Sequence, residues 1–238
     1  MILTDKENTQ ELYADLYAKY KITGTPYLPF RDLPTIIKKY VKGTRAVDYG
    51  CGTGESTLFL KSLGLEVTGV DINRQMLAEA KKKDPIGQYL NIMSGQIPLE
   101  KESCSLVFSS FVLLEISDKQ TILSVLKDIN RILKKGAIFI TVLTNDNTYS
   151  HNWLTVNTNF PENAKLYSGS KVKIELRDID LTFFDYYWTE EDYKTLIKQA
   201  ELELIDIHKP LGLDSDGYEW LDEKKVAPSS IFIAKRVV

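Results

Sequence analysis

The stretch AVDYGCGTGES, residues 46–56, places an acidic residue and three glycines where an apolar strand gives way to a helix. Gly50, Gly52 and Gly54 stand at alternate positions, so the backbone of this turn carries few side chains. The helix that follows begins with N–H groups that have no partner inside the helix. The stretch therefore predicts either a tight structural turn or a turn whose backbone contacts a ligand.

The spacing of the glycines decides which ligand fits this turn. The dinucleotide fingerprint G-x-G-x-x-G, aligned from Gly50, requires glycine at position 55, where this chain has Glu55. Asp48 stands two residues before Gly50, and its charge disfavours a pyrophosphate and favours a cationic amino group. No lysine follows the turn as in a P-loop, which excludes that kind of nucleotide site.

A second acidic residue, Asp71, ends the next predicted strand, 21 positions after Gly50. A carboxylate at this place can accept hydrogen bonds from both hydroxyls of a ribose. The turn, Asp48 and Asp71 together specify a ligand that is an adenosine bearing an amino acid.

Strand patterns and helix patterns alternate around the turn. The predicted strands cover residues 45–49, 66–71, 88–93, 104–110 and 137–143, and the predicted helices cover residues 55–63, 73–83 and 118–135. Gly64 and Gly136 are predicted to cap the first and last of these helices. The alternation predicts a parallel sheet covered by helices on both faces.

The two ends of the chain depart from this alternation. Before the turn, helices are predicted over residues 8–20 and 33–42, with Asp32 as the N-terminal cap of the second. After residue 143 the pattern predicts a hairpin of strands 171–176 and 180–188, a helix beginning at Thr189, and two last strands, 202–209 and 229–235.

Four blocks together resemble one known family. AVDYGCGTGES, VTGVDIN, CSLVFSSFVLLEI and ILKKGAIFITVL resemble, in order and spacing, the class I S-adenosylmethionine-dependent methyltransferases over residues 40–143. The resemblance implies an α/β, Rossmann-like seven-stranded sheet, mostly parallel with a C-terminal antiparallel strand, with helices on both faces and a hairpin or lid insertion. It further implies one domain over residues 1–238, with an N-terminal helical lid (1–43) and a substrate-lid insertion (144–188).

The same resemblance implies a set of cofactor-binding residues. They are Tyr13, Asp48, Gly50, Cys51, Gly52, Asp71, Ile72, Met76, Ser94, Ser109 and Phe111. The family's Gly-Asp pair after the third strand is missing, and NIMSGQIP stands there, so the candidates for adenine recognition are Ser94, Asn91 and the backbone. Tyr13, Tyr17 and Tyr20 recur at helical spacing and are expected to pack that helix on the sheet, with one of them near the methionine carboxylate.

The aromatic segment 144–188 is the candidate for the acceptor site. Trp153, Tyr186 and Trp188 are predicted to wall a substrate pocket, and the alternative is that they pack the hairpin onto the sheet. His151 and Tyr149 are the candidate catalytic residues, and a surface histidine is the alternative for His151. For Glu115, a role near substrate and a solvated or helix-capping role are both open.

Composition narrows the class of acceptor. The formal net charge of −3 gives no general signal for nucleic acid, and no proline precedes Cys51 or Cys104 as in cytosine-C5 methylation. SSFVLLE replaces the D/N/S-P-P-aromatic motif of exocyclic amine methylation, and no cluster predicts a metal. We expect a cytoplasmic methyltransferase, monomeric or homodimeric, with S-adenosyl-L-methionine as cofactor and a small-molecule acceptor methylated on N or O. A tRNA or protein methyltransferase and a catalytically silent regulatory module remain alternatives.

Overall fold

The computed structural model describes the backbone of residues 7–237 and the side chains of residues 12–237. The helices are α1 (Glu7–Tyr17), α2 (Tyr27–Tyr40), α3 (Glu55–Ser62), α4 (Arg74–Lys83), α5 (Lys119–Ile132) and α6 (Glu190–Gln199). The strands are β1 (Arg45–Tyr49), β2 (Glu66–Asp71), β3 (Gln88–Asn91), β4 (Cys104–Ser110), β5 (Leu133–Thr144), β6 (Val156–Asn157), β7 (Ser170–Leu176), β8 (Leu181–Tyr187), β9 (Leu202–His208) and β10 (Ser229–Arg236).

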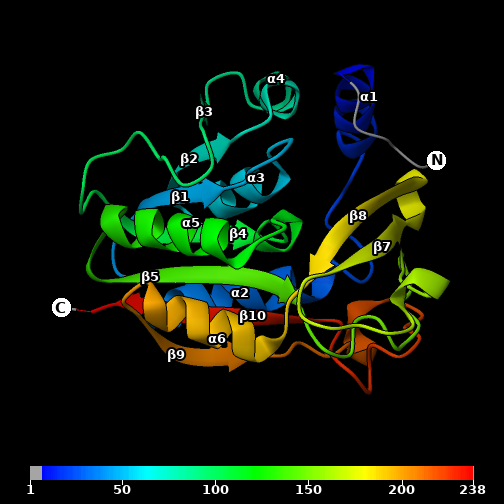
Figure 1. Cartoon of the computed structure of the whole chain (residues 1–238). Helices are drawn as coiled ribbons and strands as arrows, with labels where there is room; N and C mark the ends of the chain where they lie inside the picture. Colours follow the sequence, from blue (N-terminus) through cyan, green and yellow to red (C-terminus); the bar gives the residue numbers. More distant parts are fainter. Residues whose placement is uncertain (1–6, 238) are drawn as a thin grey trace.

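In the described chain, seven strands form one sheet in the order β3-β2-β1-β4-β5-β10-β9 (Figure 1). The pairs from β3 through β5 are parallel, whereas β10 runs antiparallel to both β5 and β9. Helices α5 and α6 cover one face of the sheet, and α2 and α3 cover the other. The predicted Rossmann-like, seven-stranded fold with its antiparallel C-terminal strand is confirmed.

Alternation of side chains along the strands creates the two core layers. Val107 packs in the layer formed with α5 and α6, while its neighbours Leu106 and Phe108 pack in the layer formed with α2 and α3. All three are fully buried. A run of apolar residues that point to both faces in turn is typical of a parallel sheet covered on both faces.

Two of the predicted helix caps are wrong. Helix α5 ends at Ile132, and buried Leu133 already pairs with Cys104 in the sheet, so Gly136 lies within β5 instead of capping the helix. Helix α2 begins at Tyr27, because prolines fit the first turn of a helix where N–H groups lack partners. Asp32 therefore lies inside α2, where it accepts hydrogen bonds from Arg31 and His208.

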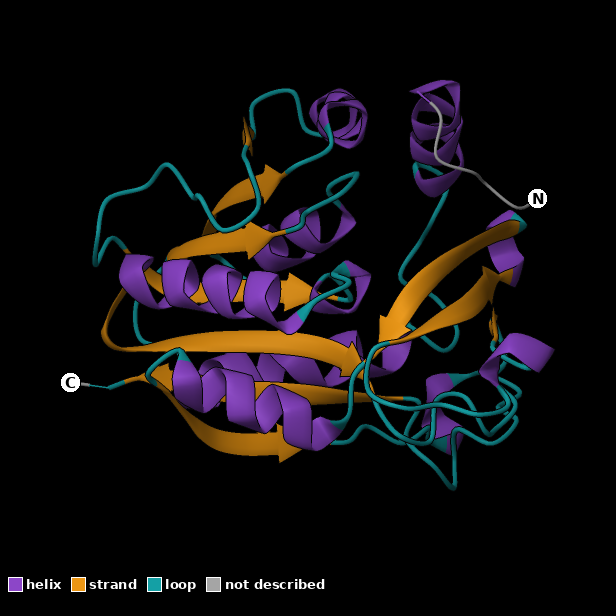
Figure 2. Cartoon of the chain, viewed as in Figure 1, coloured by secondary structure: helices purple, strands orange, loops and turns teal. Residues whose placement is uncertain are grey.

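A second sheet, in the order β6-β7-β8, is antiparallel and comes from the segment predicted as an insertion (Figure 2). Strand β8 packs against the 3-10 turn η1 (Leu113–Glu115), which follows β4, and α1 contacts both α4 and β8. The carboxyl ends of β1, β2 and β4 thus face α1 and the second sheet. No helix in residues 7–237 is both long and apolar enough to span a bilayer.

Candidate functional site

The glycine turn between β1 and α3 has a left-handed backbone at all three glycines. Their φ angles are 73° at Gly50, 49° at Gly52 and 85° at Gly54. A Cβ built on Gly50 would lie 2.3 Å from Val112 Cγ2, whereas one on Gly52 would meet nothing closer than Tyr17 Cε1 at 3.9 Å. Gly50 therefore makes a tight protein contact, and Gly52 leaves open space on the side of Tyr17.

Replacing Gly50 with alanine should cost more stability than the same change at Gly136. Both glycines have φ of 73°, but a Cβ on Gly136 would meet nothing within 4 Å. Gly136→Ala should therefore cost only the backbone strain, about 1 kcal/mol, and Gly50→Ala about 1–3 kcal/mol more for the clash with Val112. Urea unfolding of the two variants measures the difference, and equal losses would contradict the close packing described for Gly50.

Asp71 joins the glycine turn to the start of α4. Its Oδ2 accepts a hydrogen bond from the Gly52 N–H at 2.8 Å, and its Oδ1 accepts one from the Asn73 N–H at 2.7 Å. Burial raises the pKa of the Asp71 carboxyl, and these two N–H donors oppose the rise. Each carboxylate oxygen keeps a further lone pair for a hydroxyl group.

Asp48 lies beneath the turn and is fully buried. Its Oδ2 accepts hydrogen bonds from Ser56 Oγ at 2.7 Å and Thr57 Oγ1 at 2.6 Å, which fixes the first turn of α3. Its Oδ1 has no hydrogen-bond partner in the described chain. Burial raises the pKa of Asp48 to about 6, since the two hydroxyls compensate only part of the desolvation.

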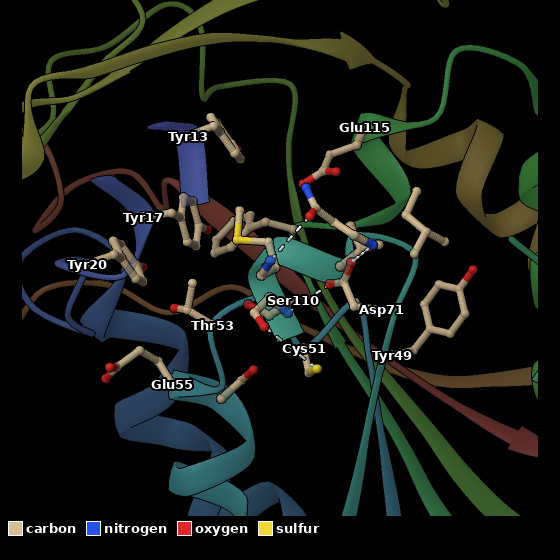
Figure 3. Close-up of a pocket in the computed structure, with 18 of the residues that line it drawn as sticks. Tyr13, Tyr17, Tyr20, Tyr49, Cys51, Thr53, Glu55, Asp71, Ser110 and Glu115 are labelled. Atoms are coloured by element: carbon tan, nitrogen blue, oxygen red, sulfur yellow. Dashed lines mark hydrogen bonds between the residues drawn. The ribbon is translucent and has the colours of Figure 1, made fainter. Parts of the chain in front are cut away.

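A cavity of about 250 Å³ opens above the turn, between it and α1 (Figure 3). Nine of the predicted cofactor-binding residues line it: Tyr13, Gly50, Cys51, Gly52, Asp71, Ile72, Met76, Ser94 and Phe111. Figure 3 shows Tyr13, Tyr17 and Tyr20 on the side opposite Asp71 and Ser110.

Two predicted cofactor-binding residues do not line this cavity. Asp48 lies below the turn, and Ser109 is fully buried with its Oγ unpartnered. Because successive strand residues point to opposite faces, Ser110 lines the cavity in place of Ser109. The cysteine in the turn, Cys51, is buried, and burial raises the pKa of its thiol well above the usual range, so it is poorly suited to act as a nucleophile.

A second cavity, of about 80 Å³, lies between α1, η1 and the second sheet. Tyr13, Tyr17, Tyr20, Phe111 and Glu115 line both cavities. The two spaces are therefore adjacent, and Glu115 stands at their junction.

Glu115 and Asp185 place two carboxyls against the second cavity. Asp185, on β8, is only 2% exposed, and its Oδ1 has no hydrogen-bond partner in the described chain. Burial raises the pKa of Asp185 to about 8. The protein around the cavity also raises the pKa of Glu115 well above its usual range, and the charge of Asp185 adds to that rise.

The predicted acceptor and catalytic residues divide between the cavity and the core. Trp153 lines the second cavity and donates its Nε1–H to the Thr148 carbonyl at 2.7 Å. Trp188 is buried in the main core instead, where its Nε1–H bonds to the Ile116 carbonyl, and Tyr186 packs against the same core. Neither residue lines a described cavity.

The structure does not bring His151 or Tyr149 into either described cavity. His151 Nδ1 lies 3.1 Å from the Asn147 carbonyl and 3.0 Å from Ser150 Oγ, and its ring rests beside Trp153. Tyr149 is buried at the edge of Tyr187, with its hydroxyl 3.4 Å from Thr144 Oγ1. Both are placed to stabilise the second sheet and its connection.

Several site residues escaped the sequence reasoning. Tyr13, Tyr17 and Tyr20 were expected to pack on the sheet, with one of them near the cofactor, and all three wall both cavities. Asp185 was not singled out, although one acid inside the aromatic run FFDYY is an unusual element of a buried strand. No group of His, Cys, Asp and Glu within the described residues is arranged to hold a metal ion.

Comparisons with known proteins agree with this geometry. A family profile described as a methyltransferase domain matches residues 47–141. The demethylmenaquinone methyltransferase of Staphylococcus aureus (strain JH9) is 35% identical over 113 residues, which are 45% of this chain and 46% of the relative. The aligned part thus spans less than half the length of that curated relative.

Solved structures extend the likeness over nearly the whole chain. An S-adenosylmethionine-dependent methyltransferase from Clostridium acetobutylicum aligns with a TM-score of 0.66 and 16% identity, covering 95% of this chain and 98% of that one. A second from Methanosarcina mazei aligns with a TM-score of 0.63 and 19% identity, covering 85% and 97%. Residues 47–141 thus match a methyltransferase domain, and the whole chain has the fold of these solved structures.

Proposed function

We propose that this chain transfers the methyl group of S-adenosylmethionine to an N or O atom of a small-molecule acceptor. The observation that carries the proposal is the pair of adjacent cavities that share the tyrosines of α1 and Glu115. One cavity adjoins the glycine turn and Asp71, and the other is enclosed by the second sheet. Such an arrangement holds two small reactants side by side.

The residues of the first cavity fit a cationic adenosine derivative. The described side chains that line it include Glu55, Asp71 and Glu115, and no lysine, arginine or histidine. Asp48 Oδ1, which has no hydrogen-bond partner in the described chain, adds a buried hydrogen-bond acceptor beneath the turn. A ligand with an ammonium group and a sulfonium matches this charge, whereas a pyrophosphate would be repelled.

Residues of the first cavity would hold the parts of S-adenosylmethionine. Asp71 would take the ribose hydroxyls, Gly52 would let the methionine part approach the backbone, and Ile72, which is 61% exposed at the cavity rim, would cover the adenine. The bound cofactor supplies a methyl carbon attached to a good leaving group. The task left to the protein is to align the acceptor and to exclude water.

The name of the Staphylococcus aureus relative refers to the methyl acceptor of that protein. Because less than half of each chain is aligned, the likeness supports the methyl-transfer chemistry and leaves the acceptor to be argued from the cavities. The second cavity, of about 80 Å³, favours a small molecule over a tRNA or a protein segment. We propose a monomer or homodimer acting in the cytoplasm.

Binding of the cofactor and of its product should raise the melting temperature, and NAD should not. At a concentration 100 times the dissociation constant, a ligand adds about 2.7 kcal/mol to the free energy of unfolding. Thermal unfolding with S-adenosylmethionine, S-adenosylhomocysteine and NAD measures this. Stabilisation by NAD alone would overturn the proposal, and a labelled-methyl screen against metabolite extracts then tests the transfer itself.

A further inference from the structure

The charged residues described as lining the second cavity are all acidic. Glu115 and Asp185 line it, and its described lining contains no lysine, arginine or histidine. Asp185 lines this cavity and not the one above the glycine turn. Its charge is therefore available to the acceptor, while Glu115 faces both spaces.

Two buried polar atoms of this cavity lack hydrogen-bond partners. Asp185 Oδ1 has none in the described chain, and neither has Ser229 Oγ, which comes from β10, a different element, and is only 3% exposed. An isolated carboxylate that loses its water is costly unless a cation or hydrogen-bond donors replace the water. The two orphaned atoms thus point to a ligand that donates hydrogen bonds and carries positive charge.

Aromatic rings line the same cavity as the two carboxyls. Tyr13 and Tyr17 are stacked with centroids 5.7 Å apart, and Tyr13 meets Phe183 of β8 edge-to-face at 6.4 Å. Trp153 lines the cavity from the segment after β5. Ring faces attract a cation, and most strongly where water is excluded.

We propose that the acceptor is a small amine, whose ammonium form is bound by Asp185 and Glu115 in the second cavity and passes a proton to one of these carboxylates. This inference rests on the proposed methyl transfer and names the class of its acceptor. An alcohol acceptor would leave the negative charge of the cavity unpaired. An extended apolar acceptor would bury both carboxyls against hydrocarbon.

The proton transfer and the methyl transfer need no further reactant. An ammonium N–H proton moves to a carboxylate oxygen, which restores the nitrogen lone pair. That lone pair forms the new N–C bond while the electron pair of the C–S bond leaves with sulfur, so the product is again an ammonium ion and the sulfonium becomes a neutral thioether. A carboxyl with a raised pKa is a suitable proton acceptor for this step, because its basicity is closer to that of an amine.

The binding experiment uses the isosteric pair benzylamine and benzyl alcohol with the full chain saturated by S-adenosylhomocysteine at pH 7. Calorimetry should show the amine binding at least tenfold more tightly than the alcohol. Asp185→Asn and Glu115→Gln should each reduce this ratio to below threefold. Asp214→Asn, at a solvent-exposed acid on the 3-10 turn Asp214–Asp216, is the matched control and should keep the ratio.

Equal affinities, binding of neither compound, or a ratio that survives both cavity variants would each overturn the inference. Since an asparagine at position 185 removes an unpartnered buried charge, the variant is expected to fold, and its melting temperature with S-adenosylhomocysteine verifies this. If the unmodified chain does not bind S-adenosylhomocysteine, the proposed function itself is contradicted.

A second experiment needs no knowledge of the acceptor. A metabolite extract is divided, and one half is treated with the amine-selective acylating reagent N-succinimidyl acetate, then quenched. Transfer of labelled methyl from S-adenosylmethionine should fall at least tenfold in the acylated half. Full transfer to the acylated half would overturn the amine assignment while leaving methyl transfer established, so the two failures are distinguishable.

Discussion

Asp185→Asn is expected to stabilise the unliganded protein above pH 6 and to reduce the fall in its stability between pH 4 and pH 8. A carboxyl with a pKa of about 8 in the fold and 3.8 in the unfolded chain makes the folded state hold more protons in this range. The free energy of unfolding therefore decreases as the pH rises through it, by at most about 5 kcal/mol. Asparagine has the same shape and does not titrate.

None of the titratable groups around Asp185 offers it a positive charge. They are Glu115 on η1, Tyr13 and Tyr17 on α1, Tyr149 after β5 and Tyr193 on α6. All are acids, so none becomes a cation as the pH rises.

Urea unfolding at pH 5, 6, 7 and 8 measures the difference between Asp185→Asn and the unmodified chain. Asp214→Asn, whose side chain is 91% exposed, should leave the pH profile unchanged. A difference that is constant with pH, or a variant that is less stable at pH 8, would show that a cation or donor already pairs with Asp185.

Asp71→Ala is expected to weaken the binding of S-adenosylhomocysteine by at least a hundredfold. The change removes the carboxylate that would hold the ribose and also frees the N–H groups of Gly52 and Asn73, which loosens the turn. Hydrogen bonds to a charged group contribute about 1.5–3 kcal/mol each, so the loss of two hydroxyl contacts is large.

Two further variants interpret this result. Asp71→Asn keeps one acceptor oxygen and should fall between the alanine variant and the unmodified chain. His151→Ala should leave the dissociation constant within twofold, because His151 lines neither described cavity. Isothermal titration measures all three, and an equally weak effect of Asp71→Ala and His151→Ala would refute the ribose assignment.

The cavity above the glycine turn could be predicted from the sequence because most of the residues that form it are close in the chain. The strand, the turn and α3 are contiguous, and Asp71 follows by one βαβ unit whose geometry the alternation of strands and helices dictates. Asp48 was placed by the same pattern, but its burial beneath the turn and its bonds to Ser56 and Thr57 depend on packing that a sequence does not display.

The second cavity was harder to predict because it is assembled from distant segments. Glu115 follows β4, Asp185 lies on β8 and Ser229 begins β10, and only the tertiary fold brings them around one space. The aromatic segment was identified, yet the direction of each ring was not. Trp153 faces the cavity, while Trp188 belongs to the core, and both satisfy the same compositional pattern.

The predicted end of α5 was wrong for a local reason. Gly136 has the left-handed backbone of a helix cap, and it adopts that conformation within β5 instead. A positive φ at glycine marks a change of chain direction without saying which element it interrupts.

The tyrosines Tyr13, Tyr17 and Tyr20, which wall both cavities, limit how such an enzyme can be redesigned. A substitution there to admit a larger acceptor would also reshape the space above the glycine turn, so gains in acceptor range would be offset by weaker retention of the methyl donor. Trp153, Ile174 and Phe183 line the second cavity alone. These three positions are where acceptor range can be varied while the donor side stays intact.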